Sequence, residues 1–94
     1  MSQEMRYPKF GVPVRIAMVD GTLIIGMVFV RQNQRVIDVV CDVRNFFPIK
    51  TNAGVSLLNK QHAVQIHLLS IEEIIEKIDL FPEVDIHYLR NNSW

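Results

Sequence analysis

The sequence predicts a mainly β domain that ends in an amphipathic helix and a trailing strand. Two β-type runs, 14–19 and 22–30, meet at Asp20-Gly21, and Asp-Gly between apolar β-formers is a strong hairpin signal. Further short β-type runs lie between residues 46 and 69. The segment 70–79 then changes from the two-residue period of a strand to the spacing of a helix. Together these patterns predict five strands followed by one helix and a last strand.

Length and composition place the chain among ordinary globular domains. At 94 residues, with 49% hydrophobic and 21% charged residues, we expect a single domain over 1–94. Cys41 is the only cysteine, which fits a reducing compartment unless it pairs with another chain. The N-terminal residues lack the apolar segment of a secretory signal, and the run 23–30 is far shorter than the roughly 20 residues of a membrane-spanning helix. We therefore expect a cytoplasmic protein with no membrane segment.

The first hairpin contains an unusual second strand. Residues 7–13 include two prolines and a glycine and predict an irregular lead-in, so the first strand is expected to begin near Val14. The run 22–30 is apolar on both of its alternating faces, so something must cover the second face. Gly26 inside this run predicts a bend or a close backbone approach, as in a small sheet that curls into a barrel. The C-terminal helix or another subunit could supply the remaining cover.

The middle of the chain contains a segment whose pattern fits both a helix and a strand. The polar run 31–35 predicts a loop. In 36–45 the valines have helical spacing while their β-branching favours a strand, and we interpret the segment as a short helical turn. The run 46–51 predicts the third strand, with Pro48 at an edge or a bulge.

The last third predicts two strands, a helix and a trailing strand. The strands are 55–58 and 63–69, joined by a tight connection. Ser70 and Glu73 form a capping box for a helix over 71–79, whose isoleucine stripe should pack on the sheet. Phe81-Pro82 ends that helix, and the alternation over 84–90 predicts a strand that adds to its own sheet or to a neighbour's.

One family pattern matches part of the chain. The segment Asp20-Gly-Thr-Leu-Ile-Ile-Gly26 resembles the first motif of the Sm-like small β-barrel, and 59–66 resembles the turn of its second motif. Arg35-Val-Ile-Asp-Val-Val40 and Phe46-Phe47 are similar to segments of uncharacterised bacterial Sm-like domains. The resemblance covers about 12–69 and implies a five-stranded barrel that assembles into rings by strand pairing between subunits. The helix and strand of 70–94 lie outside it.

Charge is distributed unevenly, which raises the question of nucleic acid. Residues 1–60 hold eight Lys/Arg against four Asp/Glu, whereas 61–94 hold two against six, and the whole chain has a net charge of zero. The basic part could contact RNA phosphates, while the acidic part could mask it or dock on a neighbouring subunit; a plain solvated surface is the third interpretation. Phe46 or Phe47 could stack a base. The candidate RNA contacts are Lys60, His62, Arg31, Arg35 and Arg44.

The apolar runs favour assembly over catalysis. Asp38 and Asp42 have no partner placed by sequence for acid–base chemistry, so we do not expect an enzyme. His62 and His67 fall on opposite faces of a strand and cannot bind one metal ion together, so we expect neither a metal nor a cofactor. The candidate oligomer contacts are Ile25, Met27, Phe29, Ile86 and Tyr88. The sequence predicts a non-enzymatic module for homo-oligomeric assembly or protein interaction. Such a module could also bind a protein partner by strand addition. The alternative is an RNA-binding Sm-like protein acting through basic loops.

Overall fold

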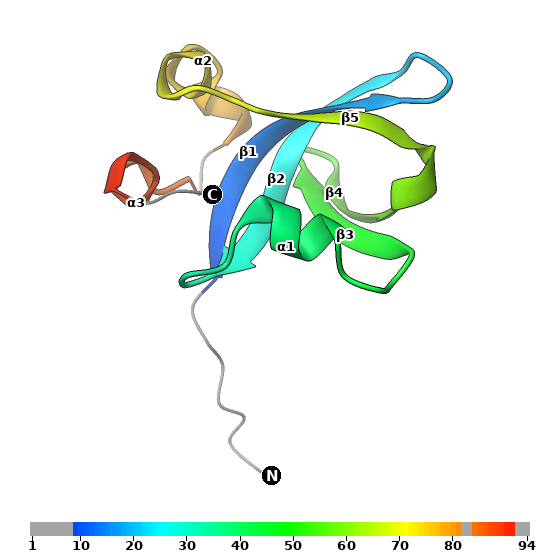
Figure 1. Ribbon diagram of the computed structural model, residues 1–94. Coiled ribbons are helices and arrows are strands. Elements are labelled where there is room, and N and C mark those ends of the chain that lie inside the picture. Colours follow the sequence, from blue (N-terminus) through cyan, green and yellow to red (C-terminus); the bar gives the residue numbers. More distant parts are fainter. Residues whose placement is uncertain (1–8, 82–83, 92–94) are drawn as a thin grey trace, which may run out of the picture.

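The computed structural model describes residues 9–81 and 84–91 and is built on one antiparallel sheet (Figure 1). Its strands are β1 (Lys9–Met18), β2 (Leu23–Arg31), β3 (Phe46–Thr51), β4 (Gly54–Asn59) and β5 (Ala63–Leu68). Its helices are α1 (Val36–Val40), η1 (Lys60–His62), α2 (Ile71–Glu76), η2 (Ile78–Leu80) and α3 (Ile86–Asn91). The predicted mainly β class and five strands are confirmed. The sheet has the order β4-β3-β2-β1-β5 and is open, so the predicted closure into a barrel is not seen.

The first hairpin forms as predicted but begins earlier. The Thr22 N–H donates to Asp20 Oδ1 at 2.9 Å, and Gly21 has a φ of +89°, which glycine adopts without strain. The prediction of an irregular segment up to Pro13 is wrong, because β1 starts at Lys9 and Pro13 pairs with Met27. The β1–β5 pairing begins only at Val14, so Pro13 has a strand partner on one side and its missing N–H is tolerated there.

Gly26 makes the close approach that the sequence predicts. It pairs with Val14 in the β1–β2 register and is buried. A Cβ atom at Gly26 would lie 2.7 Å from the Lys50 carbonyl oxygen and 2.9 Å from Ile49 Cγ1. The backbones of β2 and β3 therefore meet where only glycine fits.

The ambiguous segment after β2 contains a helix, as interpreted. Val36 to Val40 form α1, and the Arg35 N–H donates to Asp38 Oδ2 at 2.8 Å across its first turn. The helix supplies the buried side chain of Val36 to the core.

The helix after β5 is shorter than predicted. Its capping box is confirmed: the Glu73 N–H donates to Ser70 Oγ at 3.2 Å, and the Ser70 N–H donates to Glu73 Oε1 at 2.9 Å. However, α2 ends at Glu76, so the isoleucine stripe does not continue on one face. Ile74 is fully buried, whereas Ile75 and Ile78 leave 51% and 41% of their surfaces exposed.

The predicted trailing strand over 84–90 is wrong, because this segment forms α3. The Tyr88 N–H donates to Asp85 Oδ1 at 3.0 Å, which is the hydrogen bond of a helix N-terminus. Leu89 is buried, and the Tyr88 ring stacks on Phe10 with 3.7 Å between centroids. Tertiary packing thus overrides the alternating pattern.

The C-terminal helices pack against the sheet on the side away from α1 (Figure 1). Arg15 and His67 are paired across β1 and β5, and both side chains reach Glu73 of α2. Met27 belongs to the same face of the sheet and is 2% exposed. The buried C-terminal side chains Leu69, Ile74, Phe81 and Leu89 join one core cluster with those of the strands. The second apolar face of β2 is therefore covered in part from within the chain.

Candidate assembly edges and binding grooves

The two end strands of the sheet expose large apolar side chains. In β4, Val55 and Leu57 leave 66% and 68% of their surfaces exposed. In β5, Val64 is 69% exposed and Leu68 is 40% exposed. Both strands lie at the ends of the sheet order, so each has one edge with no neighbouring strand among residues 9–81 and 84–91. Such edges with apolar side chains are ready templates for another strand.

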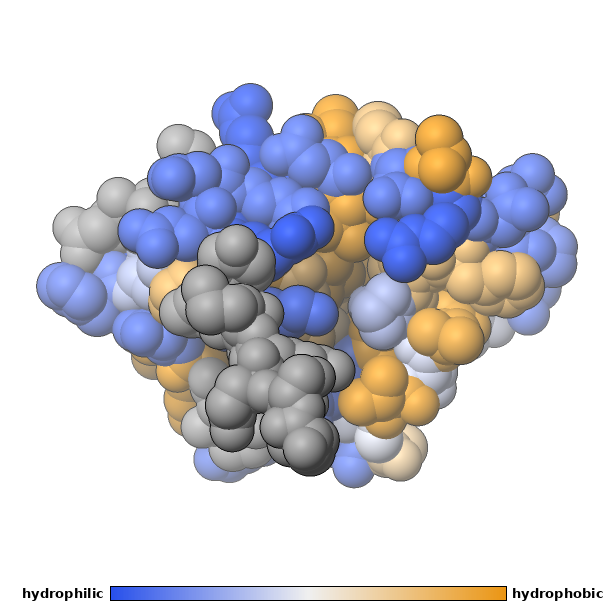
Figure 2. Space-filling model, turned by 90° about the horizontal axis from the view of Figure 1, so that it is seen from below, coloured by the Kyte–Doolittle hydropathy of each residue, from blue (hydrophilic) through white to orange (hydrophobic). Residues whose placement is uncertain are grey.

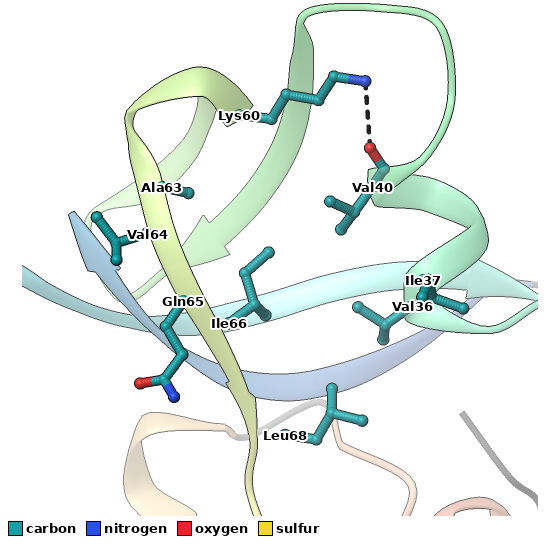
Figure 3. Close-up of a pocket in the computed structure, with 9 residues that line it drawn as sticks. All are labelled: Val36, Ile37, Val40, Lys60, Ala63, Val64, Gln65, Ile66 and Leu68. Atoms are coloured by element: carbon teal, nitrogen blue, oxygen red, sulfur yellow. Dashed lines mark hydrogen bonds between the residues drawn. The ribbon is translucent and has the colours of Figure 1, made fainter. Parts of the chain in front are cut away.

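A groove lies between α1 and β5, which is one of the two end strands of the sheet. We call it the α1–β5 groove; it has a volume of about 410 Å³. Its lining residues are Val36, Ile37, Val40, Lys60, Ala63, Val64, Gln65, Ile66 and Leu68. Figure 3 shows apolar side chains of α1 and β5 facing one another across it. The groove therefore continues the apolar surface of the β5 edge.

Lys60 closes one end of the α1–β5 groove. Its Nζ donates to the Val40 carbonyl oxygen at 3.2 Å (Figure 3) and also to the Asp42 carbonyl oxygen. The ammonium thus satisfies carbonyls at and just beyond the C-terminal end of α1, where a cation is favoured. A residue predicted to contact RNA is therefore engaged in holding α1 against the η1 turn.

A second groove lies beside the ends of β2 and β3. We call it the β2–β3 groove; it has a volume of about 660 Å³. Its lining residues are Lys9, Phe29, Arg31, Gln34, Val39, Asp42, Arg44, Asn45, Phe46, Phe47, Pro48 and Leu57. Figure 2 shows hydrophobic and hydrophilic side chains mixed at the surface on the half of the molecule away from α2 and α3. The groove combines three cationic side chains with apolar ones.

One carboxylate reduces the positive charge of the β2–β3 groove. Asp42 Oδ1 accepts hydrogen bonds from Arg44 Nε at 3.1 Å and from the Arg44 N–H at 2.9 Å. These hydrogen bonds lower the pKa of Asp42, so this carboxyl is ionised at neutral pH. The surplus positive charge of the groove therefore rests on Lys9 and Arg31.

The structure separates the predicted RNA contacts. Arg31 and Arg44 line the β2–β3 groove, whereas Lys60 lies in the α1–β5 groove. Arg35 precedes α1, and His62 lies in η1, where its carbonyl oxygen accepts from the Val19 N–H at 2.8 Å. Two of the five predicted RNA contacts thus share one groove.

The predicted oligomer contacts are mostly internal or half-buried. Met27 is buried, Ile25 and Phe29 are packed against the core, and Phe29 also lines the β2–β3 groove. Ile86 and Tyr88 belong to α3 and pack against the core. The two end strands carry exposed apolar positions as well, Val55 and Leu57 in β4 and Val64 and Leu68 in β5. Sequence patterns identify β4 as a strand but not as an end strand, because strand order depends on the whole topology.

The exposed side of α2 and η2 is acidic and apolar. We call this surface the acidic ridge; its residues are Glu72, Ile75, Glu76, Ile78, Asp79 and Leu80. Glu72, Ile75 and Glu76 are three and four positions apart, which places them on one face of the helix. Ile78 and Leu80 extend the apolar part into η2 with 41% and 39% exposure.

Glu73 fixes the acidic ridge to the sheet, and this contact predicts a pH dependence. The hydrogen bond from the Ser70 N–H, and then that from the His67 ring at 3.3 Å, lower the pKa of Glu73. A carboxyl with a lowered folded-state pKa stabilises the fold above its unfolded-state pKa, and this stabilisation is lost as pH falls through the folded-state value. We expect the melting temperature to fall on acidification from about pH 7 to about pH 3.

Glu73→Gln isolates that contribution. The variant should melt lower than the wild type at neutral pH, and the difference should shrink in acid, where Glu73 is protonated in both the folded and the unfolded state. Thermal unfolding followed by circular dichroism across this pH range measures the effect. A constant difference at all pH values would contradict the assignment to the Glu73 charge.

Comparisons with known proteins add no assignment to these surfaces. Family models, curated proteins and solved structures gave no match to the chain. Within 9–81 and 84–91, no three side chains of His, Cys, Asp or Glu gather in a way that could hold a metal ion. Across the same residues, the helices are too short or too polar to cross a membrane. The end strands and the two grooves are thus the features on which a function can be argued.

Proposed function

We propose that this chain is a non-enzymatic assembly module whose copies join by pairing β4 of one copy with β5 of the next. The observation that supports the proposal most strongly is the exposure of Val55, Leu57 and Val64 on the two unpaired ends of one open sheet. An exposed apolar edge is a liability in a monomer, and pairing between chains removes it. The Sm-like resemblance over about 12–69 agrees with the proposal, because Sm-like barrels commonly assemble by strand pairing.

The positions of the two unpaired strand edges, one on β4 and one on β5, determine the kind of assembly. The two edges belong to different strands, so a contact between them is heterologous, and each copy keeps one free edge after the first contact. Heterologous contacts produce a closed ring if the rotation between copies closes, and an open chain if it does not. We expect a ring, because it leaves the edges of all copies paired.

Three matched substitutions test the proposal. Val55→Glu places a charge on the β4 edge, Val64→Glu places one on the β5 edge, and Val43→Glu changes an exposed residue outside the strands. In β4 the new carboxylate faces Lys50 across the β3–β4 register, so the hairpin itself should be retained. Size-exclusion chromatography with light scattering should show a multimer for the wild type and for Val43→Glu, and monomers for the two edge variants.

Mixing the edge variants gives a sharper result. The Val55→Glu copy keeps an intact β5 edge, and the Val64→Glu copy keeps an intact β4 edge. An equimolar mixture should therefore form a one-to-one dimer, because each pair of copies can make a single contact. A wild type that stays monomeric, or edge variants that assemble like the wild type, would overturn the proposal.

RNA binding is a second candidate, supported by the presence of Arg31, Arg44 and Phe46 in one groove. A base could stack on Phe46 while the arginines contact phosphates. Absorbance at about 260 nm in the same chromatography, on protein purified without nuclease, tests this candidate, because salt removes nucleic acid held by phosphate contacts. Excess absorbance that disappears at high salt would support RNA binding, and its absence at low salt would argue against it.

A further inference from the structure

The β2–β3 groove is suited to an occupant that is both apolar and acidic. Phe46 and Leu57 leave 54% and 68% of their surfaces exposed on its apolar side. Lys9 and Arg31 also line it, whereas Arg44 is held by Asp42. Apolar area supplies the driving force for binding, and the unbalanced cations favour a partner with carboxylates.

The acidic ridge of α2 and η2 has the complementary composition. Ile75 and Ile78 offer exposed apolar surface, and Glu72 and Glu76 lie beside Ile75 on the helix. The division of charge within the chain follows the same pattern, with an excess of basic residues in 1–60 and of acidic residues in 61–94. The chain thus carries both halves of a matched contact.

These two surfaces do not face each other within one chain. Figure 1 places α2 on the far side of β1 from β3 and β4. The ridge of one copy can therefore meet the groove only of another copy. Such a contact is heterologous, as is the proposed pairing of β4 with β5.

Charge favours a protein surface over nucleic acid as the occupant. Proteins that bind nucleic acid usually carry a clear surplus of positive charge, whereas this chain has a net charge of zero and a pI of about 6.8.

We propose that the acidic ridge of one copy docks in the β2–β3 groove of a second copy, with Ile75 against Phe46 and Glu76 beside Arg31. The contact rests on the proposed self-assembly and adds to it an electrostatic contact made through residues other than the edge positions Val55 and Val64. Apolar area drives this contact, and charge pairing at the rim of the groove adds to its strength, so assembly becomes sensitive to salt.

A charge exchange tests the contact. Arg31→Glu changes the groove, and Glu76→Lys changes the ridge, so each alone places like charges together. Sedimentation velocity at about 0.05 M salt should show self-association weakened about tenfold or more for each variant. In an equimolar mixture of the two variants, both contacts between unlike copies bring opposite charges together and only contacts between like copies are repulsive, so the mixture should recover part of the affinity. Arg90→Glu, an exposed cation of α3, is the matched control and should associate like the wild type.

The outcomes separate this contact from the strand edges. Unchanged association of Arg31→Glu and Glu76→Lys, with the Val55→Glu and Val64→Glu variants still monomeric, would overturn the docking contact and leave the edge pairing intact. A monomeric wild type at both about 0.05 M and about 0.5 M salt would overturn both. Loss of material absorbing at about 260 nm in Arg31→Glu alone would assign the groove to nucleic acid and overturn the docking contact.

Discussion

Gly26→Ala is expected to lower the free energy of unfolding by about 3 kcal/mol, because overpacking at a fixed backbone contact is strongly destabilising. The added methyl group would lie 2.7 Å from the Lys50 carbonyl oxygen and 2.9 Å from Ile49 Cγ1. The first of these atoms belongs to the backbone of β3, so relief requires the β2 and β3 strands to separate. A domain of this size has a total stability of roughly 5–14 kcal/mol, so the loss is a large part of it.

Gly11→Ala is the matched control for this prediction. A Cβ atom at Gly11 would lie 2.8 Å from Met27 Sδ, near the far end of a flexible side chain that can move aside. The same substitution also removes some of the backbone freedom of glycine in the unfolded chain, which favours folding by about 0.5–1 kcal/mol. We therefore expect a change within about 1 kcal/mol for Gly11→Ala in urea denaturation. Equal losses for the two variants would show that the close approach of β2 to β3 does not control stability.

Local signals in the sequence predict the elements that depend on neighbouring residues. The Asp20-Gly21 turn and the Ser70–Glu73 capping box are each specified by side chains within a few positions, and both are present. The close approach at Gly26 is also predictable, because a glycine inside an apolar strand is typical of a bend or a tight backbone contact. These features form as predicted because the tertiary contacts around them are compatible with the local conformation.

Elements that depend on distant contacts are predicted less well. The alternation in 84–90 indicates a strand, but Asp85 caps a helix and Leu89 fills the core, so α3 forms instead. Pro13 indicates an irregular segment, yet β1 lacks a β5 partner at that position and tolerates the proline. Both errors arise because the tertiary contacts that decide an element, core packing for α3 and the strand neighbours for β1, are not specified by the local sequence.

The candidate site is the least predictable part of the chain. Apolar runs suggest oligomer contacts at Ile25, Met27 and Phe29; Met27 is buried within its own chain, whereas Ile25 and Phe29 are half-buried and pack partly against the core. The exposed apolar side chains of β4 and β5 matter for assembly because these strands are the ends of the sheet, and which strands are ends follows only from the order β4-β3-β2-β1-β5. Arg31 and Arg44 share a groove because α1 returns the chain to β2, which no spacing rule predicts.

Phe81→Ala is expected to lower the free energy of unfolding by about 3–5 kcal/mol, the usual cost of emptying the site of a buried phenylalanine. Phe81 is 1% exposed and lies in the same core cluster as Val12, Val14 and Val28 of the sheet. The 70–91 segment is therefore expected to unfold together with the strands, in one cooperative transition.

Phe46→Ala provides the comparison, because it removes the same side chain from a surface position. Phe46 is 54% exposed, so its loss should change stability by about 0.5 kcal/mol. Urea denaturation at a protein concentration low enough for both variants to be monomeric removes the contribution of assembly, to which Phe46 is proposed to add. If Phe81→Ala instead has the same free energy of unfolding as the wild type, the C-terminal helices contribute little to the stability of the core. In that case the acidic ridge would not be held rigidly on the sheet, and docking of that ridge would have to order it first. A large loss for Phe81→Ala and a small one for Phe46→Ala would establish that the ridge is carried by the folded core, while Phe46 remains exposed for a partner.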